Sequence, residues 1–306
     1  MTPIFFDSNH DDNTRLKNLY SGAIYVFSPT PSGIALQDFA AEFCKDYFQT
    51  QSPTTVQHEL PVSEFIETLK RLKPEFIHHP SCKKLIADIL SDLNCDQKTT
   101  YFDVPRIRTA CAGDYLSSGL AYAFKPHRDT WYSTPMSQIN WWMPIFPIGP
   151  DNGMAFHFDY WDRPIKNSSY QFNYQEWNQT GRKQAHNQGN VDKRVQSEAL
   201  EEIKTEPATT LICEPGGLIV FSAAHLHSTI PNTSNETRIS IDFRTVNESD
   251  VLGGAMNLDS ESTGTTMMDY MRLCDLEHFP AGEIESHANS IPQPQFSSAK
   301  ILNSDQ

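Results

Sequence analysis

The chain has 306 residues, of which 38% are hydrophobic, so it can bury the core of one main domain with additions. Its 38 acidic residues outnumber 24 basic ones and give a formal net charge of −14, without a local basic stripe. This charge excludes nucleic acid and an anionic membrane surface as expected partners. No apolar run has the length of a signal-peptide core or a bilayer span, so we expect a soluble, cytoplasmic protein.

The cysteine pattern fits that location. Six cysteines are scattered along the chain without CxxC pairs or short regular spacing. This distribution argues against a zinc knuckle or a disulfide framework, and we read the cysteines as reduced thiols.

Residues 1–100 are predicted to form an initial strand and then helices that brace a sheet. The β-rich segment 21–28 ends in the loop signal SPTPSG. Apolar residues then recur at helical intervals in 35–48. Ser63 and Ser81 each precede an amphipathic run and are predicted to cap two further helices.

Residues 101–250 contain many short β-prone runs separated by Pro, Gly, Asn and Asp. Such runs predict an antiparallel sandwich or barrel rather than alternating βαβ units. The polar stretch 162–206 interrupts them and is either a functional lid or a flexible surface loop. We expect residues 251–306 to form a helix and a poorly ordered tail, or an arm docked on a neighbouring subunit. The three segments are predicted to form one structural domain.

The segment KPHRDTW carries the first two candidate metal ligands. Residues two apart on an extended chain point to the same face, so His127 and Asp129 can approach one ion while Arg128 points elsewhere. An isolated HxD motif is more often a partly buried histidine bonded to a carboxylate. A second copy, His10 and Asp12, lies in an apparently disordered start and is read as chance.

His227 is the candidate third ligand, because it follows the β-run GGLIVFSA as a neighbouring strand would. Arg238 lies eleven residues later and Ser240 two beyond it, so both point to one face of the next strand. His225 competes for the ligand role, but the spacing to Arg238 favours His227, and His157 is read as structural. Two imidazoles and one carboxylate leave open positions on Fe(II) for an organic co-substrate and oxygen.

Together the segments HRD, HSTIPN and RIS resemble the Fe(II)/2-oxoglutarate-dependent dioxygenases, especially the phytanoyl-CoA dioxygenase-like branch. The resemblance covers residues 101–246 and includes Asn152 and Gly153 after the strand that follows HxD. It implies a mainly β chain with flanking α, in which N-terminal helices brace a double-stranded β-helix (jelly-roll, cupin-like) core. FHFDYWDRPIKNSS stands where that branch has a PGSH-like segment, so a CoA thioester substrate is not inferred.

The resemblance also implies roles for these residues. His127, Asp129 and His227 would bind Fe(II). Arg238 would grip the far carboxylate of 2-oxoglutarate through its planar fork, and Ser240 would add a hydroxyl donor. The expected reaction uses O2 to hydroxylate a small polar metabolite while 2-oxoglutarate loses CO2 and becomes succinate. Desaturation, cyclisation or epimerisation would begin with the same hydrogen abstraction.

Residues next to the motif are candidates for the rest of the pocket. Trp131 and Tyr132 follow HRD directly and are predicted to form the substrate-pocket wall. Gln138 and Asn140 share one strand face, where they would hydrogen-bond co-substrate or substrate, or instead satisfy buried backbone groups.

Arg106 and Arg108 lie on one face of a strand that leads into the core. Two guanidinium groups in the cavity would favour a substrate carrying carboxylate or phosphate. The competing interpretation is a paired row of surface cations.

A catalytically silent cupin-like protein that binds a metal or ligand is the alternative to an enzyme. A silent domain has no physical need for all five groups at compatible spacing, so the pattern favours the enzyme. The sequence leaves the identity of the small-molecule substrate and the oligomeric state open.

Overall fold

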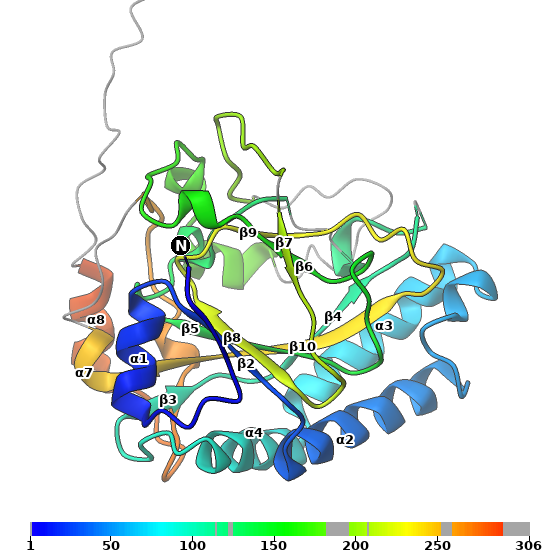
Figure 1. Cartoon of the computed structure of the whole chain (residues 1–306), viewed down its shortest axis with the longest axis horizontal. Helices are drawn as coiled ribbons and strands as arrows, with labels where there is room; N and C mark the ends of the chain where they lie inside the picture. The colour runs from blue at the N-terminus through cyan, green and yellow to red at the C-terminus, as the bar shows by residue number, and fades with distance from the viewer. Residues whose placement is uncertain are drawn as a thin grey trace, which may run out of the picture.

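The computed structural model describes most of the chain, namely residues 2–113, 115–121, 125–181, 196–206, 208–251 and 259–289. Within these residues the protein is mixed α/β, with one large sheet, one small sheet and helices packed on the large sheet (Figure 1). Parts of the predicted lid and tail, at 182–195 and 290–306, lie outside the described residues. None of the described helices is both long and apolar enough to cross a bilayer.

The strands form two sheets. The large sheet has the order β1-β2-β8-β5-β10-β3-β11, with β4 also paired to β10, and the small sheet has the order β7-β6-β9. Their bounds are β1 Ile4–Phe6, β2 Ile24–Phe27, β3 Thr100–Phe102, β4 Arg106–Ala110, β5 Ile139–Pro144, β6 Met154–Phe156, β7 Thr209–Leu211, β8 Leu218–Ser222, β9 His227–Thr229, β10 Arg238–Asn247 and β11 Met271–Arg272. The described pairs are antiparallel, except that β1 runs parallel to β2.

Helices cover one side of the large sheet, with α2, α3 and α4 beneath it in Figure 1. Their bounds are α1 Asp12–Tyr20, α2 Pro31–Phe48, α3 Val62–His78 and α4 Pro80–Asp92, followed later by α5 Tyr174–Glu176, α7 Glu248–Val251 and α8 Ala281–Asn289. Thr30 caps α2 by accepting a 3.1 Å hydrogen bond from the Gly33 amide. Pro31 suits the first turn because its fixed φ matches a helix and its missing N–H needs no partner.

Two predicted helix caps are wrong by two residues. Pro61 precedes α3 and His79 precedes α4, so Ser63 and Ser81 lie inside the first turns. His79 accepts a 3.2 Å hydrogen bond from the Ser81 amide through its ring nitrogen. The prolines move the starts, because Pro80 is favoured at the first helical position and cannot serve as an interior donor.

The N-terminal residues are ordered, contrary to the prediction. The strand β1 adds to the edge of the large sheet, and helix α1 follows it. The His10 ring lies 2.8 Å from the Tyr25 hydroxyl, and Asp12 forms a 2.6 Å ion pair with Arg15. The second HxD motif therefore makes structural contacts, and its rejection as a metal site agrees with them.

Alternation along β10 divides its side chains between two environments. Ile239, Ile241 and Phe243 are buried in the main hydrophobic cluster, which includes residues of α2, α3 and α4. Arg238 and Ser240 occupy the alternate positions, and the side of the sheet they belong to packs on the small sheet through a second apolar cluster. The polar positions of β10 therefore lie between the two sheets.

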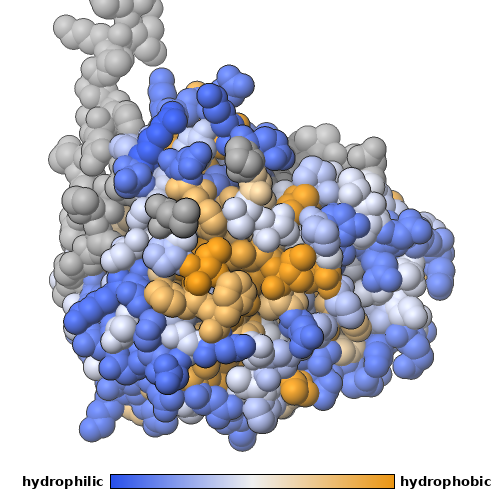
Figure 2. Space-filling model, in the orientation of Figure 1, coloured by the Kyte–Doolittle hydropathy of each residue, from blue (hydrophilic) through white to orange (hydrophobic). Residues whose placement is uncertain are grey.

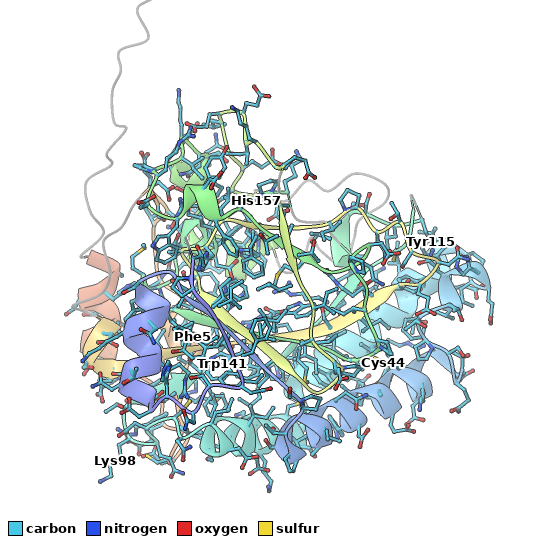
Figure 3. All side chains as sticks on the ribbon, in the orientation of Figure 1. Phe5, Cys44, Lys98, Tyr115, Trp141 and His157 are labelled. Atoms are coloured by element: carbon cyan, nitrogen blue, oxygen red, sulfur yellow. The ribbon has the colours of Figure 1, made fainter. Side chains whose placement is uncertain are left out.

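The positions of labelled side chains agree with this layering. Figure 3 places Trp141 and Cys44 toward the helices and His157 by the small sheet. Figure 2 shows hydrophobic residues gathered in the middle of the viewed face, with hydrophilic residues around them. Single exposed apolar side chains, such as Phe6 in β1 and Ile212 after β7, are normal on the surface of a globular domain.

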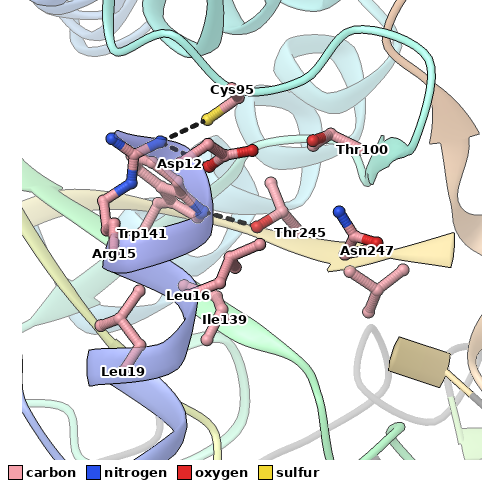
Figure 4. Close-up of a pocket in the computed structure, with 11 residues that line it drawn as sticks. Asp12, Arg15, Leu16, Leu19, Cys95, Thr100, Ile139, Trp141, Thr245 and Asn247 are labelled. Carbon is pink, nitrogen blue, oxygen red and sulfur yellow. Dashed lines mark hydrogen bonds and ion pairs between the residues drawn. The ribbon is translucent and has the colours of Figure 1, made fainter. Parts of the chain in front are cut away.

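A small cavity of about 10 Å³ lies where α1 meets the helix side of the large sheet (Figure 4). Arg15 reaches both Asp12 and the Cys95 sulfur there, and the Trp141 indole donates a 2.9 Å hydrogen bond to Thr245. Its volume suits about one water molecule. It lies on the side of β5 opposite to Asn140 and is a packing feature of the core.

The coarse prediction of antiparallel sheets in residues 101–250 is confirmed. The prediction of a mainly β chain is wrong, because the helices make the described chain mixed α/β. The described strands leave the large sheet with edges at β1 and β11, so it does not close into a barrel.

Candidate metal centre

Main-chain pairing brings the two candidate histidines together. His127 and His227 form an antiparallel bridge, and each donates its amide to the carbonyl of the other at 3.0 Å. Their ring centroids are 4.4 Å apart. His127 and His227 are 100 positions apart in sequence, and they become neighbours because β9 lies next to the HxD segment.

Each histidine ring is oriented by a backbone carbonyl. Nδ1 of His127 lies 2.9 Å from the Lys125 carbonyl, and Nδ1 of His227 lies 3.0 Å from the His225 carbonyl. Because a carbonyl only accepts, Nδ1 carries the hydrogen in both rings. Nε2 then presents a lone pair, which is the arrangement that metal-binding histidines use.

Asp129 completes a group that could hold a metal ion. One ligand atom from each of His127, Asp129 and His227 lies within 4.8 Å of the others. Nε2 of His127 is 3.4 Å from the Asp129 carboxylate. Asp129 begins the short 3-10 turn Asp129–Tyr132, which ends the extended HxD segment and sets the carboxylate beside the rings.

A chain of side-chain hydrogen bonds supports the carboxylate from behind. Asn140 of β5 donates to Asp129 at 2.7 Å and accepts from the Gln138 amide at 2.8 Å. Gln138 in turn accepts from the Tyr270 hydroxyl at 2.7 Å. Gln138 thus uses both ends of its amide inside the protein. The structure places Gln138 and Asn140 behind the candidate metal ligands, whereas the sequence offered them as contacts to co-substrate or substrate or as partners of buried backbone groups.

The protonation states suit metal binding. Burial and the neighbouring His127 ring lower the pKa of His227 to about 4, so its imidazole is neutral at physiological pH. Burial opposes ionisation of Asp129, but the adjacent His127 and His227 rings and the charge of Arg244 hold the pKa of the carboxyl well below its usual range. A neutral imidazole and an ionised carboxylate are the forms that donate to a metal.

Arg238 is a buried guanidinium without a carboxylate partner among the described residues. It donates to the carbonyls of Gly153 at 2.6 Å and Asn152 at 3.3 Å and lies over the Trp142 ring, while its Nε has no hydrogen-bond partner. The hydroxyl of Ser240 is also fully buried and has no hydrogen-bond partner among the residues that the structure describes.

These orphaned donors fit a carboxylate ligand. Burial lowers the pKa of Arg238 to about 10, which still leaves it charged at neutral pH. A buried charge without a partner destabilises the folded protein by about 3–5 kcal/mol, so binding of an anion beside Arg238 would stabilise it. Arg238 and Ser240 therefore have the chemistry expected for the far carboxylate of 2-oxoglutarate.

The two aromatic residues after HRD differ in position. Tyr132 lies edge-on to His127, with ring centroids 5.9 Å apart, and contacts Phe172 of the insertion at 5.1 Å. Trp131 is fully buried, and its indole donates a 2.7 Å hydrogen bond to Asp259. Tyr132 is thus next to the metal group, whereas Trp131 is a buried member of an apolar cluster against which Tyr132 also packs.

Arg106 and Arg108 lie on the same side of the sheet as Ser240, but both have internal partners. Arg106 pairs with the buried Asp103. Arg108 binds Asp242 through two hydrogen bonds, at 2.5 and 3.1 Å. Both guanidinium groups therefore belong to a network of paired charges. This network differs from the two predicted alternatives, which were a pair of cavity cations free to bind a substrate anion and a row of surface cations.

Two other histidines have structural positions. His225 is fully buried, lies 3.0 Å from the Gly22 carbonyl and packs against Trp161. Its own carbonyl orients His227. His157 is buried with its ring 3.0 Å from Ser228.

Sequence reasoning missed three residues near the site. Arg244 lies six positions after Arg238, so strand alternation could have placed it on the same face. Tyr270 and Phe172 carry no local signal, because they arrive from segments outside the predicted strands.

Comparison with known proteins gives matches to solved structures. No protein-family model and no curated protein matches the chain. The non-heme monooxygenase ThoJ is 14% identical, with a TM-score of 0.37 and 70% of each chain covered. The alpha-ketoglutarate-dependent epimerase SnoN from nogalamycin biosynthesis is 14% identical, with a TM-score of 0.35, covering 77% of this chain and 84% of SnoN.

A further match is EvdO2 from Micromonospora carbonacea var. aurantiaca, in complex with 2-oxoglutarate. It is 12% identical, with a TM-score of 0.36, covering 57% of this chain and 62% of EvdO2. ThoJ and SnoN are described as non-heme enzymes, and EvdO2 holds 2-oxoglutarate. At these TM-scores and identities the function of this chain rests on its own site residues.

Proposed function

We propose that this chain is a non-haem Fe(II)- and 2-oxoglutarate-dependent oxygenase with its catalytic core in residues 101–250. One observation carries the proposal. Buried His127 and His227 and the partly buried Asp129 stand together with a buried Arg238 and Ser240, and these two have no anionic partner among the described residues. A metal site alone would not need the second feature.

The proposed fold of the core is a double-stranded β-helix. Consecutive segments alternate between the two sheets: β4 is in the large sheet, the His127 segment pairs with the small one, and β5 returns to the large one. Next, β6 and β7 join the small sheet, β8 the large, β9 the small and β10 the large. This winding is what supports a jelly-roll assignment, in which ligands bind between the sheets.

Each residue has a defined task in this proposal. His127 and His227 would offer Nε2 to iron, and Asp129 would offer the oxygen not bonded by Asn140. Three protein ligands leave positions for exchangeable groups. When bound, iron and 2-oxoglutarate supply the oxidising chemistry, with O2 consumed and succinate and CO2 released.

Arg238 and Ser240 would fix the orientation of 2-oxoglutarate. A guanidinium meets a carboxylate with two charge-assisted hydrogen bonds, and in a buried site these bonds are strong. Tyr132 would shield one side of the metal group from water, because it stands edge-on to His127. We further propose hydroxylation of a small polar metabolite as the reaction.

Anaerobic titration of the purified protein with Fe(II) and 2-oxoglutarate tests the proposal. We expect a weak visible charge-transfer band in the wild type, and its loss in Asp129→Ala. Arg238→Ala should raise the apparent Kd for 2-oxoglutarate by about 100-fold, as for removal of a buried charge-assisted pair.

Arg71→Ala is the matched control, because Arg71 is exposed on α3 and remote from the metal group. It should leave the band unchanged. A wild-type protein that binds Fe(II) but forms no band with 2-oxoglutarate would favour a silent cupin-like metal-binding protein instead.

A further inference from the structure

Arg244 is a second guanidinium on the side of β10 that carries Arg238 and Ser240, and it lies close to the metal group. It pairs in register with Asn140, whose amide donates to Asp129. The charge of Arg244 is also among those that favour ionised Asp129. Its side chain is 18% exposed, so it is largely removed from water and still reachable.

The contacts of Arg244 are unusually loose for a guanidinium in this position. Its Nη atoms form ion pairs with Asp103 at 3.7 Å and Asp242 at 3.8 Å, distances that are too long for hydrogen bonds. Its Nε is buried without a hydrogen-bond partner in the part of the chain that the structure describes. Among the described residues, the planar guanidinium therefore has carboxylates nearby but no hydrogen bond to any of them.

Two of the carboxylates near Arg244 each have a closer cation. Arg106 binds Asp103 directly. Arg108 grips Asp242 with two hydrogen bonds. These pairs compensate the negative charges around Arg244. Asp269, 4.0 Å from Arg106 and bonded to the Tyr174 hydroxyl, adds a further carboxylate to the rim of the network.

Asp129 is the third carboxylate near Arg244, and it belongs to the candidate metal group. A bound divalent cation would compensate its charge. Arg244 would then keep its two long ion pairs but have no hydrogen-bonded anion among the described residues.

We propose that Arg244 binds a carboxylate of a small-molecule ligand beside the metal centre. The inference rests on the proposed function and adds a substrate class to it, namely an anionic metabolite held by this carboxylate. Arg238 and Ser240 have the orphaned donors for the far carboxylate of 2-oxoglutarate. The carboxylate at Arg244 would come either from the primary substrate or from the other end of 2-oxoglutarate.

Arg244→Gln and Arg244→Lys test the proposal, because Gln removes the charge and Lys keeps it without the fork. Arg163→Gln is the matched control, since Arg163 is an exposed residue paired with Glu201. The first measurement is the Kd of 2-oxoglutarate, from the anaerobic Fe(II) charge-transfer band. The second measurement is the shift of that band when aliphatic, aromatic and amino-acid carboxylates are added. The primary amide of each carboxylate is tested separately as its uncharged control.

Two results would support the inference and distinguish the sources. If Arg244 binds 2-oxoglutarate, Arg244→Gln should raise its Kd by about 10-fold or more, with a smaller rise in Arg244→Lys. If Arg244 binds the primary substrate, the Kd of 2-oxoglutarate should stay within about threefold. At least one carboxylate, but not its amide, should then shift the wild-type band and bind Arg244→Gln about 10-fold more weakly.

The inference is overturned if Arg244→Gln forms the band normally, keeps the Kd of 2-oxoglutarate and responds to every probe as the wild type does. Absence of the band in the wild type would overturn the proposed function itself, and with it this inference. Arg244→Lys keeps the test open if the Gln variant fails to fold. The two failures are therefore distinguishable by the wild-type spectrum.

Discussion

Asn140 joins the metal group to the interior of the large sheet, because its amide bonds both Asp129 and Gln138. We expect Asn140→Leu to lower Fe(II) affinity by about 10–100-fold, since partners that orient a metal ligand have effects of this size. Equilibrium dialysis under anaerobic conditions measures the affinity. Asn18→Leu makes the same change where the amide bonds the Tyr25 hydroxyl, and it should retain wild-type affinity. Equal affinities in the two variants would contradict the role of Asn140.

A substitution of Trp131 tests whether this residue lines the substrate pocket, as the sequence predicted, or packs in the core. Trp131→Phe removes part of a fully buried side chain and its hydrogen bond to Asp259. We expect it to lower the free energy of unfolding by about 2–4 kcal/mol, measured by urea denaturation, without changing the Kd of 2-oxoglutarate. Tyr132→Phe, which loses only a hydroxyl bonded to the Ser197 carbonyl, should cost about 1 kcal/mol or less. A stable Trp131→Phe with impaired 2-oxoglutarate binding would refute this placement.

At the scale of elements, α2 packs closely against the turn before β8, where Gly33 of the helix lies against Gly216 of the turn. A Cβ added to Gly33 would lie 2.2 Å from the Gly216 carbonyl oxygen, which is backbone and cannot swing aside. Gly33→Ala should therefore destabilise the protein by about 1–3 kcal/mol in urea denaturation, despite the better helix propensity of alanine.

Gly282 of α8 provides the matched control. A Cβ there meets no atom within 4 Å. Gly282→Ala should be neutral or stabilising by up to about 1 kcal/mol, because only the propensity changes. If Gly33→Ala unfolded at the same urea concentration as Gly282→Ala, the close approach of α2 to this turn would be wrong.

Element boundaries were less predictable than element types. The helical spacing of apolar residues in 35–48 correctly predicted that α2 ends at Phe48. This spacing identifies the residues that face the core, and it stops where the helix stops. The starts of α3 and α4 depended on Pro61 and Pro80, whose backbone preferences outweigh a nearby serine. The strand β1 was missed because three residues at a sheet edge carry little periodicity.

At the scale of the whole molecule, stability should depend on pH through buried neutral histidines. Burial lowers the pKa of His225 to about 3 and that of His227 to about 4. The folded state thus binds fewer protons than the unfolded state, whose histidines titrate near 6.5. The contribution of these histidines to the free energy of unfolding is therefore fully present above about pH 6.5. It is lost as the pH falls toward 4, at up to about 1.4 kcal/mol per pH unit for each histidine.

Urea unfolding of the metal-free protein between pH 7 and 4.5 measures this slope. His225→Gln, whose amide can still donate to the Gly22 carbonyl, should reduce the slope, because it removes one of the described histidines whose pKa burial lowers; the others are His157, His227 and His287. The surface variant His58→Gln, on an exposed residue, is the comparison. An unchanged slope in His225→Gln would show that acid acts elsewhere.

The sequence by itself determined the chemistry of the candidate site. Strand alternation is local, so the spacing of His127, Asp129, Arg238 and Ser240 could be read without knowing the fold. Only the tertiary structure decided which groups support them. Pairing of β5 with β10 placed Asn140 and Arg244 side by side, and Tyr270 arrived from a segment more than a hundred residues after Gln138. Such partners depend on contacts between distant segments, and no local pattern encodes which polar group will neutralise a buried charge.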